Sequence, residues 1–446
     1  MFGCHIGRCF QVTVSGGSYQ DGLAAIIQGL PPGLRVTEQE VYGDLLLRKP
    51  GADELSSPRK EPDLPVICTG VNAADTIKGA GNRGLTNGTP LTVFIPNLDR
   101  HDIHVEQYQD TNRTPRPGHA SYATFAKYGP SDDAVGAGIF SGRYTCTIVA
   151  AGAIAKRVLQ RCGIEVFSYI DEAAGVACPE IDSAKALELT NQYKRMRHDH
   201  DPFYQEIYVR GRIKPEMRLL QKMAVLAEVE KEIDAIRSRT PVFDADAIKE
   251  KYGVHSVINC PDLDAAEAML EACNRITASG DSSGGVVKVV VRGAPTGLGE
   301  PVFAKLDGEL GRMLGIGAVK GVEVGAGFRV KDMTGYQNND QMHSENGKVV
   351  FDSNNAGGIT GGLATGQDII VRVAVKPTPT IAKPQHTIDK YTHQDAKLSA
   401  ITRRDPTIVG RIWPVAENYT AMVLLDHLIM HLGYQGLARE VSASGS

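Results

Sequence analysis

The sequence mixes strand-like and helix-like segments without the regular β–α alternation that a doubly wound sheet requires. The clearest strands are predicted at 286–291 (VVKVVV) and 368–376 (DIIVRVAVK), because β-branched residues run through both. Helices are predicted at 149–160 and at 416–432, and the second should end at Gly433. This irregular order favours an α+β fold over a parallel α/β sheet.

The first third of the chain is rich in glycine, proline and turn signals, between short apolar runs such as 93–95. This pattern predicts strands joined by loops. The composition changes at 183–238, where charged residues recur with helical periodicity. We therefore expect one domain built from two parts of the chain, an inserted segment and a disordered tail. The domain takes residues 1–180 and 256–440, the charged, mainly helical insertion takes 181–255, and the tail takes 441–446.

Composition argues against several classes of function. Of 446 residues, 48 are basic and 52 acidic, and the formal charge of −4 does not favour general binding to nucleic acid or membranes. No apolar run is long enough to span a bilayer, and the first ten residues lack the apolar stretch of a signal peptide. The eight cysteines form no C-x-x-C pair, so neither a zinc site nor a disulfide framework is expected. A reducing cytoplasm is the simplest location.

Four clusters of glycine or proline beside charged or hydroxylic residues are candidates for ligand-binding loops. They are RPGH at 116–119, GDSSGG at 280–285, SNNAGGITGGLATGQ at 353–367 and TRRDP at 402–406. Backbone N–H groups in such loops can approach a ligand closely. Taken alone, each cluster is more often an ordinary turn than a phosphate cradle.

Cationic residues gather in or beside turn-rich segments. They are Arg48, Lys49, Arg59, Lys60, Arg116, Arg143, Lys376, Arg403 and Arg404. Arginine forks match the geometry of carboxylate and phosphate groups. We therefore expect a small polyanionic ligand where these side chains converge.

Two histidine signals have an ordinary structural explanation. RHDHD at 197–201 contains metal-binding residue types, but it lies in the charged insertion, so we interpret it as a solvated loop and expect no metal site. His119 on its own is more often a hydrogen-bonded structural residue than a catalytic one. Neither stretch establishes a site by itself.

Motifs along nearly the whole chain, apart from the insertion, resemble those of the chorismate synthase family, in order and from end to end. They are IGRCFQVT (6–13), GLPPGL (29–34), RKEPD (59–63), NGTPL (87–91), RPGHA (116–120), KYG (127–129), AAGAIAK (150–156), GDSSGG (280–285), GLGEPVFAKLD (297–307), AVKGVE (318–323), NNAGGITGG (354–362), KPTPTI (376–381) and RDP (404–406). So many ordered matches are far more specific than any single motif.

The resemblance implies a fold, a reaction and a cofactor. The family's protomer is a β-α-β sandwich that assembles into a homotetramer. Its members eliminate phosphate and a ring proton from 5-enolpyruvylshikimate 3-phosphate to give chorismate, in the shikimate pathway of aromatic amino acid biosynthesis. They require reduced FMN without making a net redox change. Two carboxylates and a phosphate on the substrate, and another phosphate on FMN, would account for the cationic residues.

The resemblance also assigns roles to individual positions. His119 matches a proton donor near the departing phosphate, Asp405 matches an aspartate linked to proton transfer at the flavin, and Tyr19 stands at another proton-transfer position. Substrate-binding positions match Arg48, Arg116, Arg143 and Arg403. Flavin-contacting positions match Ser141, Gly317, Ala318, Gly361, Lys376, Pro377, Thr378, Pro379, Thr380 and Arg403. In the family, the segment matching 376–380 holds the FMN phosphate.

Several positions depart from the family pattern, and they cluster at the ligand. The family's Gly-Glu-Ser-His-Gly is GGSYQ at 16–20, so Tyr19 replaces a histidine. A phenol with a pKa near 10 is a poor acid at neutral pH, so Tyr19 either donates a hydrogen bond or only packs beside the flavin. The other replacements are Ile139, Leu47 and Glu54 for arginines, Phe140 for a serine, Tyr144 for a glutamate, Ser121 for an aspartate and Arg404 for a histidine.

Three functions follow from these observations. The leading one is a reduced-FMN-dependent lyase that forms chorismate. The second is a diverged paralogue acting on a related, less anionic cyclic substrate. The third is a non-catalytic regulatory protein that binds flavin or a metabolite, with 181–255 as its partner surface. Turnover of the enolpyruvyl substrate separates the first from the other two.

Overall fold

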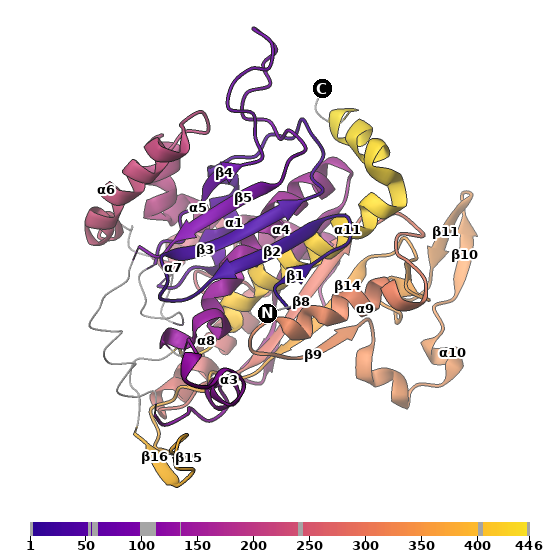
Figure 1. Ribbon diagram of the computed structural model, residues 1–446. Helices are drawn as coiled ribbons and strands as arrows, with labels where there is room; N and C mark the ends of the chain where they lie inside the picture. Colours follow the sequence, from indigo (N-terminus) through magenta and orange to yellow (C-terminus); the bar gives the residue numbers. More distant parts are fainter. Residues whose placement is uncertain are drawn as a thin grey trace.

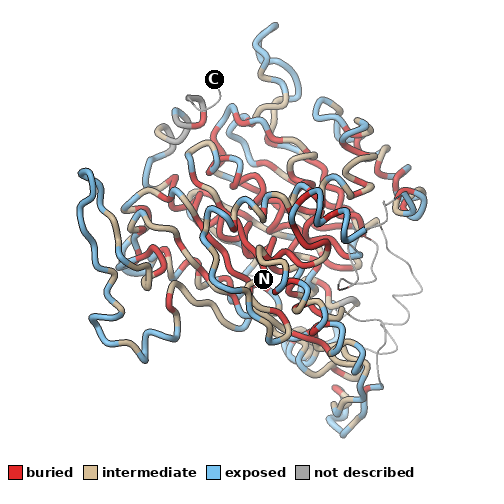
Figure 2. Tube along the Cα trace, turned by 180° about the vertical axis from the view of Figure 1, so that it is seen from behind, coloured by how far each residue is buried: buried red, intermediate tan, exposed pale blue. Residues whose placement is uncertain are grey.

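The computed structural model describes residues 3–51, 55, 61–98, 113–133, 135–239, 244–399 and 405–443. Two five-stranded sheets enclose a central layer of helices, which makes a β-α-β sandwich (Figure 1). Buried residues concentrate in these three layers, and exposed residues follow the projecting loops and hairpins (Figure 2). The predicted α+β class is confirmed.

The first sheet is antiparallel, with the strand order β1-β2-β3-β5-β4. Its strands are β1 (His5–Ile6), β2 (Gln11–Gly16), β3 (Gly22–Gln28), β4 (Val66–Thr69) and β5 (Leu91–Pro96). Along β3 the side chains of Leu23, Ala25 and Ile27 are buried at every second position, as expected for a strand with one face on the core. The turn at 17–21 between β2 and β3 carries Tyr19.

The second sheet is also antiparallel, with the order β7-β6-β8-β14-β9. Its strands are β6 (Glu165–Ala173), β7 (Val176–Ala177), β8 (Gly285–Arg292), β9 (Val319–Val324) and β14 (Ile369–Val375). The strands predicted at 286–291 and 368–376 are therefore the neighbours β8 and β14, and Val287 lies opposite Val373. The segment 376–380 leaves this sheet at the end of β14.

Three helices form the central layer: α1 (Glu38–Arg48), α4 (Thr145–Arg161) and α11 (Val409–Ala443). The expectation of only strands and loops in the first third was wrong, because α1 lies there. Its start was readable in the sequence, since Thr37 and Glu40 form a reciprocal capping box. The helix predicted at 149–160 is α4. It packs closely on α11, because a Cβ at Gly152 would lie 2.3 Å from Asn418.

The last helix, α11, is longer than the sequence predicted. It begins at Val409 and includes Pro414, and its helical backbone breaks at Gly433, the predicted end, before a second helical stretch that runs to Ala443. Gly433 itself has φ 69° and ψ 157°, so it interrupts the helix where the pattern predicted a stop. The helix therefore reaches into 441–446, where we expected a disordered tail, and 444–446 lie outside the described residues.

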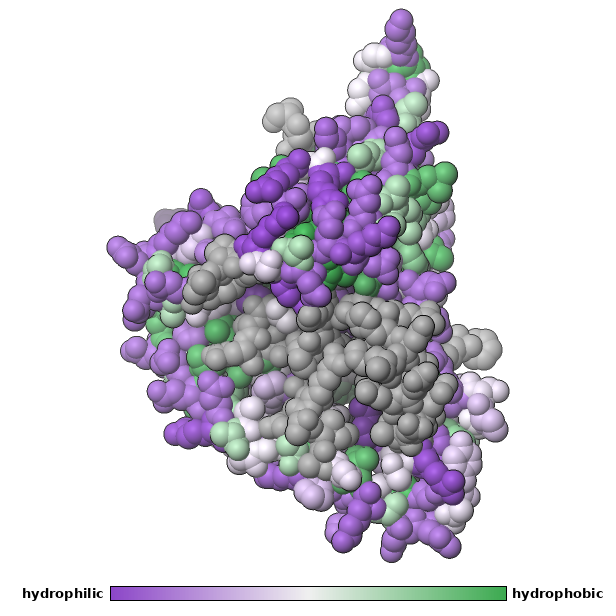
Figure 3. All heavy atoms as spheres, turned by 90° about the vertical axis from the view of Figure 1, so that its left-hand side faces the viewer, coloured by the Kyte–Doolittle hydropathy of each residue, from purple (hydrophilic) through white to green (hydrophobic). Residues whose placement is uncertain are grey.

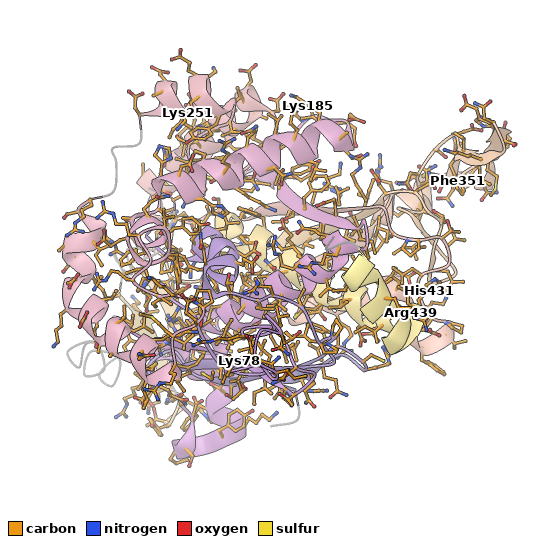
Figure 4. The ribbon with its side chains drawn as sticks, turned by 90° about the horizontal axis from the view of Figure 1, so that it is seen from above. Lys78, Lys185, Lys251, Phe351, His431 and Arg439 are labelled. Carbon is orange, nitrogen blue, oxygen red and sulfur yellow. The ribbon has the colours of Figure 1, made fainter. Side chains whose placement is uncertain are left out.

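The segment 181–255 contains α5 (Ser183–His200), a π-helical turn (Tyr204–Val209), α6 (Leu219–Arg237) and α7 (Ala245–Tyr252). Helices α5 and α7 lie against each other, and Figure 4 shows Lys185 and Lys251 at the same edge of the molecule. The interpretation of 197–201 as a solvated loop was wrong: it forms the end of α5, and Asp201 is buried.

Buried ion pairs attach this segment to the central helices. Lys222 of α6 pairs with Glu38, and Asp201 pairs with Lys49 directly after α1. Lys194 Nζ of α5 lies 2.7 Å from Glu417 Oε1 of α11. Breaking one side of a buried pair costs about 3–5 kcal/mol because the other charge stays buried. The inserted helices are therefore part of the packed structure around α1.

The remaining elements lie around the sandwich. They are α3 (Ser121–Tyr128), α8 (Leu263–Ala278), α9 (Leu306–Gly311), α10 (Gly335–Asn338), β10 (Met342–Glu345), β11 (Lys348–Phe351), β12 (Ile359–Thr360), β13 (Leu363–Ala364), β15 (Gln385–Ile388) and β16 (Asp395–Leu398). The hairpin β10–β11 projects from the body of the molecule, with Phe351 on it (Figures 1 and 4). Within the described ranges, no helix combines the length and apolarity needed to cross a membrane.

Candidate active site

Two of the predicted substrate arginines meet on one buried carboxylate. Arg48 ends α1, and its side chain is 1% exposed. Its Nη2 lies 3.2 Å from Asp63 Oδ2, and its Nη1 donates to the Arg143 carbonyl at 3.2 Å. Arg143 pairs with the other oxygen of the same carboxylate. One carboxylate between two guanidinium groups leaves this arginine cluster (Arg48, Asp63 and Arg143) with a net positive charge.

The backbone at Asp63 is held in an uncommon conformation. Its φ is +58°, in the left-handed region, which costs a non-glycine residue on the order of 1–3 kcal/mol. Such strain persists where surrounding contacts fix the residue, and here Asp63 is wholly buried between Arg48 and Arg143. The two charge-assisted contacts therefore determine the position of both arginines.

Asn97 connects the arginine cluster to the turn that carries Tyr19. Its side-chain oxygen accepts a hydrogen bond from Arg143 Nε at 2.9 Å. Its side-chain nitrogen donates to the carbonyls of Gly17, at 3.0 Å, and Gln20, at 2.6 Å. Tyr19 is half-buried on this turn. The turn with Tyr19, where the family has a histidine, is thus linked to the arginine cluster through the side-chain amide of Asn97.

A second group forms where the loop before α3 meets the end of β14. Arg116 Nη1 donates to Thr380 Oγ1 at 3.4 Å, and Arg116 Nη2 lies 3.5 Å from His119 Nε2. Lys376 Nζ donates to the Gly118 carbonyl. The structure therefore brings the predicted proton donor beside the segment predicted to hold a phosphate. We call these four side chains the histidine group: Arg116, His119, Lys376 and Thr380.

His119 is electrostatically disfavoured as a cation. Burial, and then the charges of Arg116 and Lys376, lower the pKa of His119 to about 4, so its imidazole is neutral at pH 7. Its Nδ1 is buried and has no hydrogen-bond partner among the described residues. Burial, and then the nearby Lys320, also lower the pKa of Lys376. A bound anion would offset the cations, raise both pKa values and favour protonation of His119.

Arg411 connects the arginine cluster to Asp405. Its Nη1 lies 3.5 Å from Asp405 Oδ2, and its Nε donates to the Arg48 carbonyl at 3.1 Å. Thr378 Oγ1 donates to the Asp405 carbonyl at 2.7 Å, so Asp405 is fixed beside the end of β14. The predicted proton-transfer aspartate therefore lies between the arginine cluster and the segment 376–380.

Gly317 and Ala318, two predicted flavin positions, are held near the end of β14 by hydrogen bonds of their backbone groups. The Tyr144 hydroxyl accepts a hydrogen bond from the Gly317 N–H at 2.9 Å and donates to the Gly315 carbonyl at 3.1 Å. The Ala318 carbonyl accepts the Lys376 N–H at 3.0 Å. Burial raises the pKa of Tyr144, so its phenol stays protonated at neutral pH. Positions far apart in the sequence thus meet beside the end of β14.

The other predicted positions are less concentrated. The Ser141 hydroxyl caps the helical turn 142–144. Pro377 and Pro379 pack against glycines of two neighbouring loops. Gly361 forms the turn between β12 and β13, and its φ is +65°. Five residues of interest lie outside the described residues: Glu54, Arg59, Lys60, Arg403 and Arg404.

Sequence reasoning missed three residues that organise the site: Asp63, Asn97 and Arg411. Asp63 ends the RKEPD motif, which was noted only as part of the resemblance. Asn97 directly follows β5, and Arg411 lies in the first turn of α11. An isolated carboxylate, amide or arginine carries no local signal, because each acts on partners distant in the sequence.

The histidine group has the chemistry of a phosphate site. It combines a guanidinium, an ammonium and a hydroxyl, which are the usual donors to phosphate oxygens. No cluster of three histidine, cysteine, aspartate or glutamate side chains suited to a metal ion occurs in the part of the chain that the structure describes. The arrangement can therefore hold an anion and exchange protons with it through His119.

Comparisons with known proteins identify the family. The family model for chorismate synthase matches residues 10–429. The chorismate synthase of Acetivibrio thermocellus is 36% identical, over 99% of this chain and 98% of that protein. The chorismate synthase of Methanosarcina mazei is also 36% identical, over 96% of this chain and 97% of its own length.

A solved structure extends the agreement to the fold. A crystal structure of chorismate synthase covers 98% of both chains with a TM-score of 0.60 at 23% sequence identity. The model match and the two relatives span both sheets, the central helices and the loops of the histidine group. The resemblance read from the motifs is thereby confirmed, and the chain belongs to the chorismate synthase family.

Proposed function

We propose that this protein is a phosphate lyase that converts 5-enolpyruvylshikimate 3-phosphate into chorismate. Membership of the chorismate synthase family supports the reaction. The observation that carries the proposal is the histidine group, in which a neutral histidine lies between two cations at a phosphate-binding set of donors. A reaction that expels phosphate needs these properties: charge neutralisation at the leaving group and a nearby proton carrier.

The substrate's phosphate would bind on the Arg116 and His119 side of the histidine group, and Lys376 and Thr380 would be left for the phosphate of the cofactor. Arg116 would neutralise part of its charge, and His119 would take up a proton as the dianion approaches, because the anion offsets the cations that lower its pKa. The protonated imidazole could then donate to the departing phosphate. Asp405, oriented by Arg411, would accept a proton on the other side of the reaction.

The arginine cluster would supply a positive field rather than exposed contacts. Arg48 and Arg143 are both paired with Asp63 and buried, so their charges act on an anionic substrate through the low-dielectric interior. Arg403 would complete the set of substrate-binding arginines. Tyr19 would border the same space, because its turn is held by Asn97.

The cofactor would be reduced FMN. Lys376 and Thr380 would hold its phosphate, with Pro377, Thr378 and Pro379 shaping the loop between them. Ser141, Gly317, Ala318, Gly361 and Arg403 would contact the rest of the molecule. When bound, reduced FMN supplies an electron-rich ring that assists loss of phosphate without net oxidation. The residues fit this group, because the end of β14 combines a cation with hydroxyl donors.

The protein would act as a homo-oligomer, with a tetramer as the expected form. The described face on the side of α6 is mostly hydrophilic (Figure 3). Large apolar side chains are instead exposed around the short helical turns η5 (Val302–Ala304) and η7 (Gly327–Asp332) and around α10 and β10–β11. They include Phe303, Phe328, Tyr336, Met342 and Val349. Burial of such side chains favours association. Light scattering on the purified protein tests this, and a monomer would contradict it.

The location would be the cytoplasm. All eight cysteines are free, and such thiols are usual in a reducing compartment. Fractionation of the source cells tests this proposal, and recovery of the protein outside the cytoplasm would contradict it.

The decisive experiment is an anaerobic assay with reduced FMN and 5-enolpyruvylshikimate 3-phosphate, in which chorismate absorbance and released phosphate are followed together. Equal amounts of both products are expected. A flavin titration in the same buffer measures cofactor binding separately. Flavin binding without either product would contradict the proposed reaction and favour a diverged relative with another ligand.

A further inference from the structure

Tyr144 makes a contact that neither the fold nor the proposed chemistry requires of a tyrosine. Its hydroxyl is bonded at once to the Gly317 N–H, at 2.9 Å, and to the Gly315 carbonyl, at 3.1 Å. It directly precedes α4, and its own carbonyl accepts the Thr147 hydroxyl at 2.6 Å, so its backbone is anchored in the central layer. The phenol therefore links the helix layer to residues 315–318, which we call the cofactor loop.

A hydroxyl suits these two partners better than the glutamate that the family pattern has at this position. An O–H group donates one hydrogen bond and accepts others, so Tyr144 can satisfy an N–H and a carbonyl of the same loop. An ionised carboxylate only accepts, and it would face the Gly315 carbonyl oxygen with like charge. Burial raises the pKa of Tyr144, which keeps the donating proton in place at neutral pH.

The cofactor loop is strained and is fixed from two sides. Ala318 has φ +73°, a left-handed conformation that a non-glycine residue adopts only when its surroundings impose it. On one side the Ala318 carbonyl accepts the Lys376 N–H at 3.0 Å. On the other side Tyr144 binds the loop just before Ala318. Without the phenol, the loop would keep its backbone bonds, from Lys376 to Ala318 and from Val319 to Ile316, but would lose its link to the helix layer through Tyr144.

We infer that Tyr144 is a positioning residue that fixes the cofactor loop in the conformation that binds FMN. It acts through Gly315 and Gly317, and it does not itself touch the reacting atoms. This inference rests on the proposed FMN site, and it deepens that proposal by naming what holds the loop. The loop's conformation, rather than new contacts to the cofactor, is what Tyr144 contributes.

The test is Tyr144→Phe, which keeps the ring and removes both hydrogen bonds. The dissociation constant for FMN, measured anaerobically by fluorescence titration, should rise about tenfold, as expected for losing two neutral hydrogen bonds that order a binding loop. The absorption spectrum of FMN bound to the variant should shift towards that of free FMN, because the loop no longer holds one conformation. A purely structural role would leave that spectrum unchanged.

Tyr193→Phe is the matched control. The Tyr193 hydroxyl also makes two hydrogen bonds: it donates to the Val257 carbonyl at 2.8 Å and accepts from Arg197 at 3.4 Å. Tyr193 lies on α5, in the segment 181–255. Both variants should lower the melting temperature to a similar extent, and only Tyr144→Phe should weaken FMN binding. An unchanged or lower dissociation constant for Tyr144→Phe overturns the inference while leaving the FMN site standing. Failure of the unmutated protein to bind FMN overturns both.

Discussion

The arginine cluster and the histidine group are both rich in positive charge, but they use it differently. In the arginine cluster, Asp63 lies between Arg48 and Arg143, and every charge in it is buried. In the histidine group, the neighbours that shift the pKa of His119 and of Lys376 are themselves cations. Cations paired with a carboxylate stabilise the protein, whereas cations that lie beside one another favour the binding of an anion.

This difference predicts where mutations act. Breaking the arginine cluster should reduce the free energy of unfolding, because it leaves buried charges without compensation. Breaking the histidine group should reduce binding or turnover with little effect on folding, because His119 is disfavoured as a cation beside Arg116 and Lys376 in the free protein. The following predictions test that separation, beginning with the largest expected effect.

Asp63→Asn removes the charge of the buried carboxylate with almost no change in shape. The two guanidinium groups would lose the negative charge that lies between them, so the free energy of unfolding should fall by about 3–5 kcal/mol in urea denaturation. Glu188→Gln is the control, because its ion pair with Lys185 is exposed on both sides and should contribute less than about 1 kcal/mol. Equal stability of the two variants would mean that Asp63 does not compensate the arginines.

His119→Ala should act on turnover instead. If the imidazole carries the proton to the leaving phosphate, the rate of chorismate formation should fall about 10²-fold or more. The melting temperature should change little, because His119 is disfavoured as a cation and its Nδ1 makes no hydrogen bond to a described residue. His343→Ala, on the exposed hairpin β10–β11, should leave the rate unchanged. Full activity of His119→Ala would remove the proposed proton donor.

The lowered pKa of His119 also predicts a pH dependence of stability. The imidazole has a pKa of about 4 in the folded protein and near 6.5 when unfolded, so between these values the unfolded state binds more protons. Stability should therefore rise with pH from about 4 to about 6.5, and the His119 contribution should be about 3 kcal/mol across that window.

Denaturation curves at several pH values, compared between the unmutated protein and His119→Ala, measure this contribution. Inorganic phosphate should reduce it, because a bound anion raises the pKa of His119 towards its ordinary value. Parallel pH profiles for the two proteins would show that burial and the neighbouring cations do not lower the pKa of His119 as the structure indicates. A reduced slope with phosphate would link the histidine group to anion binding directly.

The sequence predicted much of the fold because the informative patterns are local or ordered. The strands at 286–291 and 368–376, and the helix at 149–160, follow from residue periodicity alone. The family motifs predicted the sandwich. Helix α1 was missed among the glycine-rich segments, although Thr37 and Glu40 carry the capping signal in their spacing.

The site was less predictable, because its organisation depends on contacts between distant segments. Asp63 and Arg143 lie 80 positions apart in the sequence (143 minus 63), and no local pattern marks the pair. Arg411 reaches the Arg48 carbonyl across the central layer. The residue types at each loop could be predicted from the sequence, but the pairs that these residues form could not. The pairing decides whether a cation stabilises the fold or binds a ligand.

Tyr19 provides the smallest and most discriminating test. It stands where the family has a histidine, on a turn that Asn97 fixes to the arginine cluster rather than to the histidine group. Its phenol is a poor acid at neutral pH, so Tyr19→Phe should lower turnover by no more than about threefold, far less than the ~10²–10⁴-fold typical of losing a general acid. Tyr122→Phe, at an exposed position on α3, is the control that measures how much the loss of a tyrosine hydroxyl by itself changes turnover.

Tyr19→His sharpens the result. A histidine at this turn would restore a group that titrates near neutral pH, so turnover of the enolpyruvyl substrate should rise above that of the unmutated protein. Both variants are measured in the anaerobic assay at saturating FMN, so that cofactor affinity does not enter. If Tyr19→Phe proves more damaging than His119→Ala, the proton carrier lies on the turn beside the arginine cluster, and the division of labour between the two charged regions is the reverse of the one proposed.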